Sequence, residues 1–433
     1  MFSVTLLLYN LLFPVLFALY FPFYLIHLVK RGNWRRGFLE KLGWYGREKR
    51  AQLAQLARPV WVHAVSVGET VAALGFIRAW REREPAQAFV LSTTSSTGQQ
   101  LARDKAPAGV VTIYFPLDWL PCVGLALRAV RPSQLLLVEG EIWPTVIWVA
   151  TRRGVPVSVI NGQISDRAAV GYRRHRWLFA PLFRRLRVFA VQAADDAERV
   201  RAVMGPAAGL VVCGSMKFDQ VPDRDRGDVS DLLARVFPSE RLVFCAASTH
   251  APEEAIVARV TRQLQAQVPG LRTILVPRHH ERTAEVEAVL RAAGANYVLL
   301  TDLRASPEPR PADLLVVNTT GELMNFLAAS DFTFVGKSLG DFGGDGGHNI
   351  IEPAIFGKPI IVGPAVENFR DIVQVFRDRQ AVIQVADEAK FARELTRLAT
   401  DAEARARLGA AARRTVEEQR GAIAKTIALV AGR

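Results

Sequence analysis

The strongest candidate for chemistry in this sequence is a glycine-rich segment at residues 336–353, in which Asn349 and Glu352 follow two pairs of glycines. The apolar residues just before it, 331–335, predict a buried strand, and a helix can begin at Ile350. Glycines let the backbone approach a ligand closely, and the free N–H groups of a helix N-terminus favour an anion. Residues three apart share one face of a helix, so Asn349 and Glu352 could hold a phosphate and a ribose. The alternative is a flexible surface loop capped by the asparagine.

A second candidate for anion binding follows the predicted strand at residues 271–276, where the chain reads Pro-Arg-His-His. The planar guanidinium of Arg278 can pair with a phosphate in a bidentate manner. His279 can form a hydrogen bond with a base or a phosphate, whereas His280 is predicted to be structural. Both candidate segments lie in the second half of the sequence, which is therefore predicted to bind a nucleotide.

Acidic residues stand at similar places in the first half, after two predicted buried strands. Glu69 follows the first of these strands, and Glu139 and Glu141 follow the other. Each can be a functional acid, but each can also be a first-turn residue that complements a helix dipole. His63, inside the first strand, is predicted to be a core residue.

One more carboxylate, Glu40, lies in a basic and aromatic segment at residues 31–50. The cations of such a segment can hold anionic lipid head groups, each contributing about 1 kcal/mol near the membrane surface. Lipid binding does not explain a carboxylate between Leu39 and Lys41. A carboxylate at this position could act as a general base for a membrane-embedded hydroxyl group.

The preceding segment, residues 1–29, contains no Asp, Glu, Lys or Arg and is long enough for a membrane anchor. It has no basic n-region and no small-residue cleavage site, so we expect it to remain uncleaved. Cations follow from Lys30 onward, which predicts that the rest of the chain is cytoplasmic. Pro14 and Pro22 leave open whether the anchor spans the bilayer or lies in one leaflet.

The chain as a whole is basic, with 55 Lys and Arg against 42 Asp and Glu among 433 residues, a net charge of +13. This balance suits nucleic acid, an anionic membrane surface or an acidic substrate. A second basic and aromatic run at residues 167–187 fits a nucleic-acid patch or a surface that meets phosphorylated lipid, and the anchor favours the lipid. The three cysteines form no CxxC pair, which argues against a disulfide scaffold or a zinc site.

Predicted strands and helices alternate along the chain, which favours parallel sheets with helices on both faces. Ligands of such sheets bind beyond the carboxyl ends of the strands, where the candidate residues lie. The polar stretch 221–229 is the predicted hinge, and residues 387–430 are predicted to form a solvated packing helix. The predicted fold class is α/β, with an N-terminal membrane-anchor helix (residues 1–30) and two Rossmann-like domains (31–220 and 221–433) facing across a cleft.

These motifs, taken in order, resemble the lipid A Kdo transferases, which act in bacterial lipopolysaccharide synthesis with 3-deoxy-D-manno-octulosonate (Kdo). Each matching piece is short, but the ordered set is specific and covers nearly the whole chain after the anchor. The matching pieces are Leu39-Glu40-Lys41-Leu42-Gly43, Ser66-Val67-Gly68-Glu69, Glu141-Ile142-Trp143-Pro144, Lys217-Phe218-Asp219, Ala247-Ser248-Thr249-His250, Pro277-Arg278-His279, Gly321-Glu322-Leu323, Gly346-Gly347-His348-Asn349, Glu352-Pro353 and Asn368-Phe369.

The resemblance implies a GT-B fold, CMP-Kdo as donor, a lipid A precursor as acceptor, and an inner-membrane anchor with the catalytic domains on the cytoplasmic side. It implies no metal and no other cofactor, and we expect anionic inner-membrane lipids, but no nucleic acid, as partners. Residues 31–220 would be the acceptor-binding domain and 221–433 the CMP-Kdo domain, and Glu40 matches the family's catalytic base. The implied donor-side residues are Arg278, His279, Gly321, Glu322, Ser338, Gly347, Asn349 and Glu352, and those on the acceptor or Kdo side are Ser66, Gly68, Glu69, Ser95, Glu139 and Lys217.

Three positions depart from the family's pattern: Gly140 replaces a hydroxyl residue, Gln163 a common Arg, and His280 a common Pro. Other interpretations remain open. A UDP-sugar transferase acting on a lipid would share the fold, and a membrane-anchored binding protein would use the cleft without turnover. A nucleic-acid binder would show a steep salt dependence but leaves the ordered loops without a role.

Overall fold

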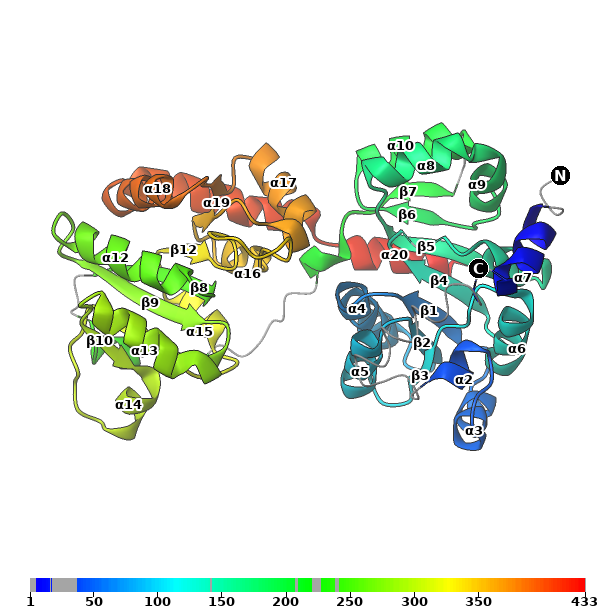
Figure 1. Cartoon of the computed structure of the whole chain (residues 1–433), viewed down its shortest axis with the longest axis horizontal. Helices are drawn as coiled ribbons and strands as arrows, with labels where there is room; N and C mark the ends of the chain where they lie inside the picture. Colours follow the sequence, from blue (N-terminus) through cyan, green and yellow to red (C-terminus); the bar gives the residue numbers. More distant parts are fainter. Residues whose placement is uncertain are drawn as a thin grey trace. The chain divides into compact units, whose positions relative to one another are not determined.

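The computed structural model describes residues 5–15, 17, 37–140, 142–206, 209–219, 227–237 and 241–432. The chain divides into two compact units (Figure 1). Unit 1 comprises residues 1–220 together with 419–433, and unit 2 comprises residues 221–418. The two units are described separately below.

Unit 1 is built on a seven-stranded parallel sheet with the order β3-β2-β1-β4-β5-β6-β7. The strands are β1 (Val60–Ala64), β2 (Phe89–Thr93), β3 (Val111–Tyr114), β4 (Gln134–Val138), β5 (Val157–Gly162), β6 (Phe189–Val191) and β7 (Leu210–Val212). The helices between and before them are α2 (Phe38–Lys41), α3 (Arg47–Gln55), α4 (Val67–Arg83), α5 (Ser96–Lys105), α6 (Leu120–Val130), α7 (Pro144–Arg152), α8 (Asp166–Arg174), α9 (Arg176–Phe183) and α10 (Ala194–Met204), followed by the 3-10 helix η1 (Met216–Asp219).

The strands of unit 1 are apolar on both faces because helices cover both sides of the sheet. In β4, Leu135 and Leu137 point into one buried cluster, while Leu136 and Val138 point into another. The strands themselves are covered on both faces, so a ligand can reach this sheet only at the loops that follow the strand ends.

Unit 2 has its own seven-stranded parallel sheet with the order β10-β11-β9-β8-β12-β13-β14. The strands are β8 (Leu242–Thr249), β9 (Leu271–Pro277), β10 (Tyr297–Leu299), β11 (Leu314–Val316), β12 (Phe332–Val335), β13 (Ile360–Val362) and β14 (Ile383–Gln384). The helices are α11 (Ser230–Ala234), α12 (Glu253–Gln265), η2 (His280–Arg282), α13 (Thr283–Ala292), α14 (Leu300–Ala305), α15 (Leu323–Ala328), α16 (Ile351–Ile355), η3 (Glu367–Phe369), α17 (Arg370–Asp378), α18 (Glu388–Thr400) and α19 (Ala402–Gln419). The predicted α/β class with two parallel sheets is confirmed.

The predicted second domain, residues 221–433, is wrong at its C-terminal end. Helix α20 (Ala422–Ala431) belongs to unit 1. Its apolar residues Ile423, Ile427 and Val430 are buried in the same cluster as α4, so this part of residues 387–430 is not a solvated helix. The helix joins unit 1 because its apolar face needs a matching apolar surface.

The chain leaves unit 1 and returns to it at neighbouring points. The carboxylate of Asp219 accepts hydrogen bonds from the N–H groups of Gly421 (2.6 Å) and Ile423 (2.7 Å). These groups belong to the first turn of α20, so Asp219 satisfies donors that the helix itself cannot. Residues 221–226 of the predicted hinge lie outside the described residues.

Most of the predicted anchor also lies outside the described residues, but residues 5–15 form a helix. Nothing in the described part of the chain is a helix long and apolar enough to cross a bilayer. The Asn10 side chain docks this helix on unit 1, since it donates to Thr145 Oγ1 (3.0 Å) and accepts from the Leu120 N–H (2.7 Å). Five large apolar side chains remain exposed on it: Leu7, Leu8, Leu11, Leu12 and Val15.

A buried carboxylate lies under the same helix. Asp118 accepts hydrogen bonds from Tyr9 Oη (3.3 Å) and from the N–H groups of Thr145 (3.1 Å) and Val146 (2.8 Å). Burial raises the pKa of Asp118 to about 6, although these hydrogen bonds oppose the shift. The N-terminal helix is therefore attached to unit 1 by these polar groups and by Leu6, which is buried in the core of unit 1, while its other leucines are exposed.

Candidate functional site

Glu40 lies on the short helix α2 with both carboxylate oxygens in use. Oε1 accepts from Lys49 Nζ at 2.6 Å, and Oε2 accepts from the Tyr114 N–H at 2.9 Å. Tyr114 ends β3, so Glu40 is fixed at the carboxyl edge of the sheet. A Cβ at Gly43 would come within 2.6 Å of the Cys122 carbonyl oxygen, so the glycine of this motif lets the chain pack closely on α6.

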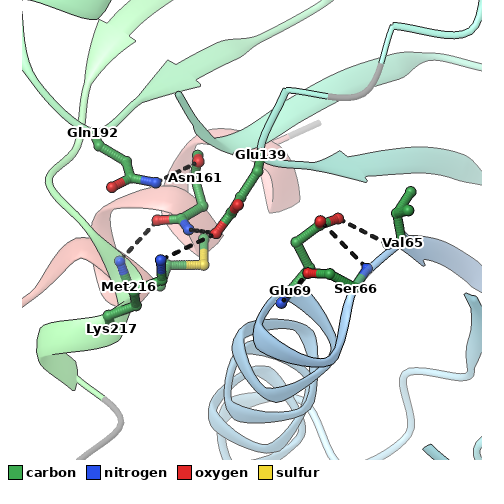
Figure 2. Close-up of polar contacts among 8 residues, drawn as sticks. All are labelled: Val65, Ser66, Glu69, Glu139, Asn161, Gln192, Met216 and Lys217. Carbon is green, nitrogen blue, oxygen red and sulfur yellow. Dashed lines mark hydrogen bonds and ion pairs between the residues drawn. The ribbon is translucent and has the colours of Figure 1, made fainter. Parts of the chain in front are cut away.

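Glu69 forms a capping box at the start of α4. Its carboxylate accepts from the N–H groups of Val65 (2.8 Å) and Ser66 (3.3 Å), and Ser66 Oγ accepts from the Glu69 N–H (3.2 Å). This geometry, shown in Figure 2, matches the helix-capping alternative. Ser95 caps α5 in the same way through the Gly98 N–H (3.1 Å). Both residues shape the loops at the sheet edge, and a role in substrate contact stays a prediction.

Gly68 is exposed in the first turn of α4. A Cβ placed on it would meet nothing closer than Ser66 Oγ at 4.0 Å, so packing within the protein does not require a glycine there. The position is suited to close approach of a ligand.

Glu139 and Lys217, which are far apart in sequence, form an ion pair with Nζ to Oε1 at 3.7 Å. Asn161 holds this pair in place, because its Nδ2 lies 3.4 Å from Glu139 Oε1 and its Oδ1 accepts from the Met216 N–H at 2.9 Å. Gln192 Nε2 in turn donates to the Asn161 carbonyl (3.0 Å). Figure 2 shows these residues converging from the ends of several strands. The polar site in unit 1 is therefore a connected network.

The sequence analysis missed Asn161 and Gln192. The available signal was an asparagine directly at the end of a buried strand, a position with φ of 53° that asparagine tolerates better than most residues. Glu139 also has a positive φ, 62°. Its neighbour Gly140 is tightly placed, since a Cβ there would come within 3.0 Å of the Gln163 carbonyl oxygen. Two of the three departures from the family pattern thus lie against each other.

Other predictions in unit 1 have simple outcomes. His63 is confirmed as a core residue, because it is fully buried and stacks on Phe115 with ring centroids 3.5 Å apart. Burial lowers the pKa of His63 to about 3, so the imidazole is neutral. Glu141 lies outside the described residues.

In unit 2 the glycine-rich segment is held by Glu253, a carboxylate in the first turn of α12 that was not among the predicted site residues. Glu253 is fully buried and accepts hydrogen bonds from the N–H groups of Lys337 (2.7 Å), Ser338 (2.8 Å) and Leu339 (2.8 Å). It also accepts from the His250 N–H at 2.9 Å. Burial raises the pKa of Glu253, and the four donors oppose this. One side chain thus fixes the loops after β8 and β12 to each other.

Five basic or imidazole groups surround this point. The His250 ring lies 5.4 Å from that of His279 and 5.2 Å from that of His348, measured between centroids. Burial and the neighbouring charges of His250, Arg278 and Lys337 lower the pKa of His348 to about 3. In the described ranges no carboxylate pairs with the Arg278 guanidinium, which is exposed. The cluster is well suited to an anion, and Arg278 and His279 lie in it as predicted.

Asn349 and Glu352 also approach each other as predicted, with Nδ2 to Oε1 at 3.4 Å. Asn349 Oδ1 accepts from the Ile351 N–H (3.0 Å), so the asparagine also caps α16. This helix has only five residues, and its dipole is correspondingly small. An anion in this unit would be stabilised mainly by the basic cluster.

Several predicted donor residues have structural partners. Ser338 is buried, and its Oγ accepts from the Gly363 N–H (2.8 Å) and donates to the Val335 carbonyl (2.6 Å), so it holds the loop from inside. Glu322 binds Arg304 with both oxygens (2.7 and 2.5 Å), which lowers the pKa of Glu322. The backbone glycines complete the set: Gly321 and Gly347 have φ of 85° and 93°.

Among the residues that the structure describes, no group of His, Cys, Asp and Glu side chains is arranged to hold a metal ion. Three of the four histidines of unit 2, His250, His279 and His348, are grouped with Arg278 and Lys337. Lys337 also pairs with the exposed Asp345, with Nζ to Oδ2 at 2.6 Å.

Comparison with known proteins identifies relatives of this chain. A family model described as 3-deoxy-D-manno-octulosonic-acid transferase (kdotransferase) matches residues 36–220. The 3-deoxy-D-manno-octulosonic acid transferase of Haemophilus influenzae is 28% identical over 93% of this chain and 92% of its own length. The enzyme of the same name from Bordetella pertussis is 33% identical over 76% of each chain.

Two solved structures are also similar. UDP-GlcNAc 2-epimerase from Neisseria meningitidis matches 87% of this chain and all of its own at a TM-score of 0.56 and 11% identity, which supports a GT-B-like fold. The C-terminal CMP-Kdo binding domain of WaaA from Acinetobacter baumannii is 31% identical over 41% of this chain and 91% of that domain, at a TM-score of 0.38. On the similarity to the Bordetella pertussis enzyme and the family model, this chain belongs to the 3-deoxy-D-manno-octulosonic acid transferase family.

Proposed function

We propose that this Kdo transferase moves Kdo from CMP-Kdo to a lipid A precursor, with inversion and without a metal, at the cytoplasmic face of the inner membrane. The observation that carries the proposal is the link between Glu40 and the N-terminal helix. The Leu117 N–H donates to the Lys41 carbonyl (2.7 Å), and the Leu120 N–H donates to Asn10 Oδ1 (2.7 Å). One short segment thus joins the candidate base to a helix with exposed leucines.

The N-terminal surface supports an acceptor that is embedded in a membrane. Besides the leucines of the first helix, Leu39 beside Glu40 is 61% exposed and Trp44 is 66% exposed. Isolated exposed apolar residues are ordinary, but a group of them around a carboxylate favours a lipid surface. The bilayer would bring the acceptor hydroxyl to Glu40, and the basic residues near it would meet anionic lipid heads.

In the proposed reaction Glu40 takes the proton from an acceptor hydroxyl while that oxygen attacks the anomeric carbon of Kdo. The carbon–oxygen bond to CMP breaks on the opposite face, which inverts the configuration. Glu40 is oriented for this by Tyr114 and Lys49. The network of Glu139 and Lys217 would contact the acceptor or Kdo side.

The leaving phosphate gains negative charge, and the basic cluster of unit 2 is suited to stabilise it. Arg278 carries a positive charge with no carboxylate partner among the described residues, whereas the charge of Lys337 is shared with Asp345 (2.6 Å). Asn349 would add a hydrogen bond. In other enzymes the loss of one such donor costs on the order of 10²–10³ in rate. The imidazole of His348 stays neutral at physiological pH, because its pKa is lowered to about 3, so it can accept or donate a hydrogen bond without adding charge.

The test is transfer from CMP-Kdo to a tetra-acylated lipid A precursor without metal, with wild type, Glu40→Gln and a matched control side by side. Glu48→Gln is the control, because Glu48 is an exposed acid on the neighbouring α3. We expect a mass-shifted lipid product from wild type and Glu48→Gln, and almost none from Glu40→Gln.

Each other outcome points elsewhere. An active Glu40→Gln variant would exclude Glu40 as the base. No product from a folded wild type that binds CMP would indicate a different acceptor. Competition by UDP rather than CMP would favour a UDP-sugar transferase, and binding of ligand without turnover would favour a binding protein.

A further inference from the structure

Unit 1 carries four arginines around one surface pocket. The pocket lies at the amino ends of the strands, whereas Glu69 and Glu139 lie at the carboxyl ends. We propose that this arginine pocket, formed by Arg58, Arg128, Arg131 and Arg153, binds the phosphate group of an anionic ligand. Nothing in the proposed transfer reaction uses these residues, so the proposal does not depend on the donor or the acceptor.

The pocket has a volume of about 550 Å³ and half of its lining residues are arginines. Arg58 lies just before β1, Arg131 follows α6 and Arg153 follows α7. Their positions at the amino ends of β1, β4 and β5 place them at the edge away from the catalytic loops. Leu127, Pro132, Gly154 and Val155 complete the lining.

Two of the four guanidinium groups are held by backbone carbonyls. Arg131 Nη2 donates to the Ala54 carbonyl at 3.2 Å, and Arg153 Nη1 donates to the Gly124 carbonyl at 3.1 Å. These bonds use part of the donor capacity of each group, since a guanidinium has five N–H donors. The remaining donors are held near the pocket, while Arg58 and Arg128 have no ion-pair partner among the described residues and are exposed.

The two helices that end at the pocket, α6 and α7, carry no acidic residue to balance these charges. The sequence contains no Asp or Glu between residues 119 and 138 or between residues 142 and 165, which together include α6 and α7. A cation at a helix C-terminus is favourable, and this accounts in part for Arg128, Arg131 and Arg153. It does not account for Arg58, which belongs to neither helix, or for the convergence of all four on one pocket.

A phosphate group fits this arrangement better than a carboxylate of similar size. Planar guanidinium groups bind its oxygens in pairs, and a phosphate offers enough oxygens for several arginines at once. The phosphate could belong to a soluble molecule or to a lipid head group. Exposed Leu120 and Leu125 on the same helix α6 make the lipid source worth a separate arm of the test.

The test uses the full chain and two double variants with equal loss of charge. Arg58→Gln with Arg128→Gln removes the two arginines that have no carbonyl partner. Arg83→Gln with Arg103→Gln is the control, because these are exposed arginines of unit 1 outside the pocket. The soluble probe is pyrophosphate, titrated into wild type and both double variants; any binding at the basic cluster of unit 2 is common to all three. The lipid probe is a phosphatidylcholine vesicle with or without phosphatidylglycerol.

We expect the pocket variant to bind pyrophosphate at least about tenfold more weakly than wild type, with little change in the control. Arg128→Lys keeps the positive charge but loses the planar guanidinium that binds two oxygens at once, and it should give an intermediate affinity. A selective loss of vesicle binding would identify a lipid head group as the source, and a loss for pyrophosphate alone would identify a soluble phosphate. Equal effects of the two double variants on both probes, or no effect of either, would overturn the proposal.

Discussion

The loops at the carboxyl ends of the two sheets differ in charge although the sheets are built alike. Those of unit 1 present Glu40, Glu69 and Glu139, with Lys217 as a partner. Those of unit 2 present Arg278, Lys337 and three histidines. The scaffold of parallel strands sets where the loops gather, and the side chains alone decide that one unit suits a base and the other an anion.

The residues that brace the loops differ for the same reason. Unit 1 uses a neutral amide, Asn161, next to the carboxylate of Glu139, where a second carboxylate would repel it. Unit 2 uses a carboxylate, Glu253, whose charge is met by four N–H donors and lies among cations. Asn161 and Glu253 are thus each matched to the charge of the site that they support.

Replacing Glu253 with Gln should have the largest effect of the changes considered, because it weakens the loops after β8 and β12 in unit 2. The amide –NH₂ would face N–H groups that need an acceptor, and leaving such groups unsatisfied costs about 1–3 kcal/mol. We expect the KM for CMP-Kdo to rise about 10- to 100-fold, with the KM for the lipid acceptor unchanged. Steady-state kinetics with each substrate varied in turn will measure this. Glu281→Gln, at an exposed position, is the control. An unchanged KM for the donor in the Glu253→Gln variant would refute the role of Glu253 in holding the donor loops.

Replacing Asn161 with Asp should have the next largest effect, because it disturbs the ion pair of Glu139 and Lys217 in unit 1. The new carboxylate keeps the bond to the Met216 N–H but repels Glu139 and competes for Lys217. We expect the KM for the acceptor to rise at least about fivefold to tenfold, since a pair of like charges about 4 Å apart costs about 1 kcal/mol even in bulk water. CMP affinity should stay as in wild type. The exposed Asn296→Asp is the control, and an equal effect of both variants would argue against a specific role for Asn161.

The last expected effect is on stability rather than on catalysis, and it concerns the imidazole in the core of unit 1. The folded pKa of His63, about 3, lies below the ordinary unfolded value, so the unfolded state binds the proton more tightly and stability falls as pH drops from about 6.5 toward 3. Between pH 7 and pH 5 the loss should be about 2 kcal/mol, and His63→Gln should abolish it. Asp118, with its raised pKa, acts in the opposite direction near pH 4–6 and cancels when wild type and variant are compared.

Urea unfolding followed by tryptophan fluorescence measures this difference in unit 1 alone, because all eight tryptophans precede residue 220. A difference in unfolding free energy between wild type and His63→Gln that is independent of pH would contradict a neutral buried His63.

Much of the fold could be predicted from the sequence, because strands buried on both faces are continuous apolar runs and each is followed by a polar loop. The motif order identified the family and most loop residues. The return of α20 to unit 1 could not be predicted, since an apolar helix face indicates burial but not the surface that buries it. Glu253 and Asn161 were missed because their partners lie 84 and 55 residues away along the chain.

Local sequence patterns also could not distinguish a residue that holds its own loop from one that contacts a ligand. Glu69, Ser95 and Ser338 follow strands exactly as ligand-binding residues do, yet each forms hydrogen bonds that hold its own loop. A residue type at a loop position does not reveal which way its side chain points. That direction depends on packing between segments that the sequence separates.

The bond between Asp219 and the first turn of α20 has a consequence for how the protein is made. Unit 2 is an insertion within unit 1, because the chain departs and returns at this point. On the ribosome, the whole of unit 2 is synthesised before residues 419–433 become available to fill the core of unit 1. Unit 2 can therefore complete its folding first, and unit 1 cannot complete its core until residues 419–433 have been synthesised.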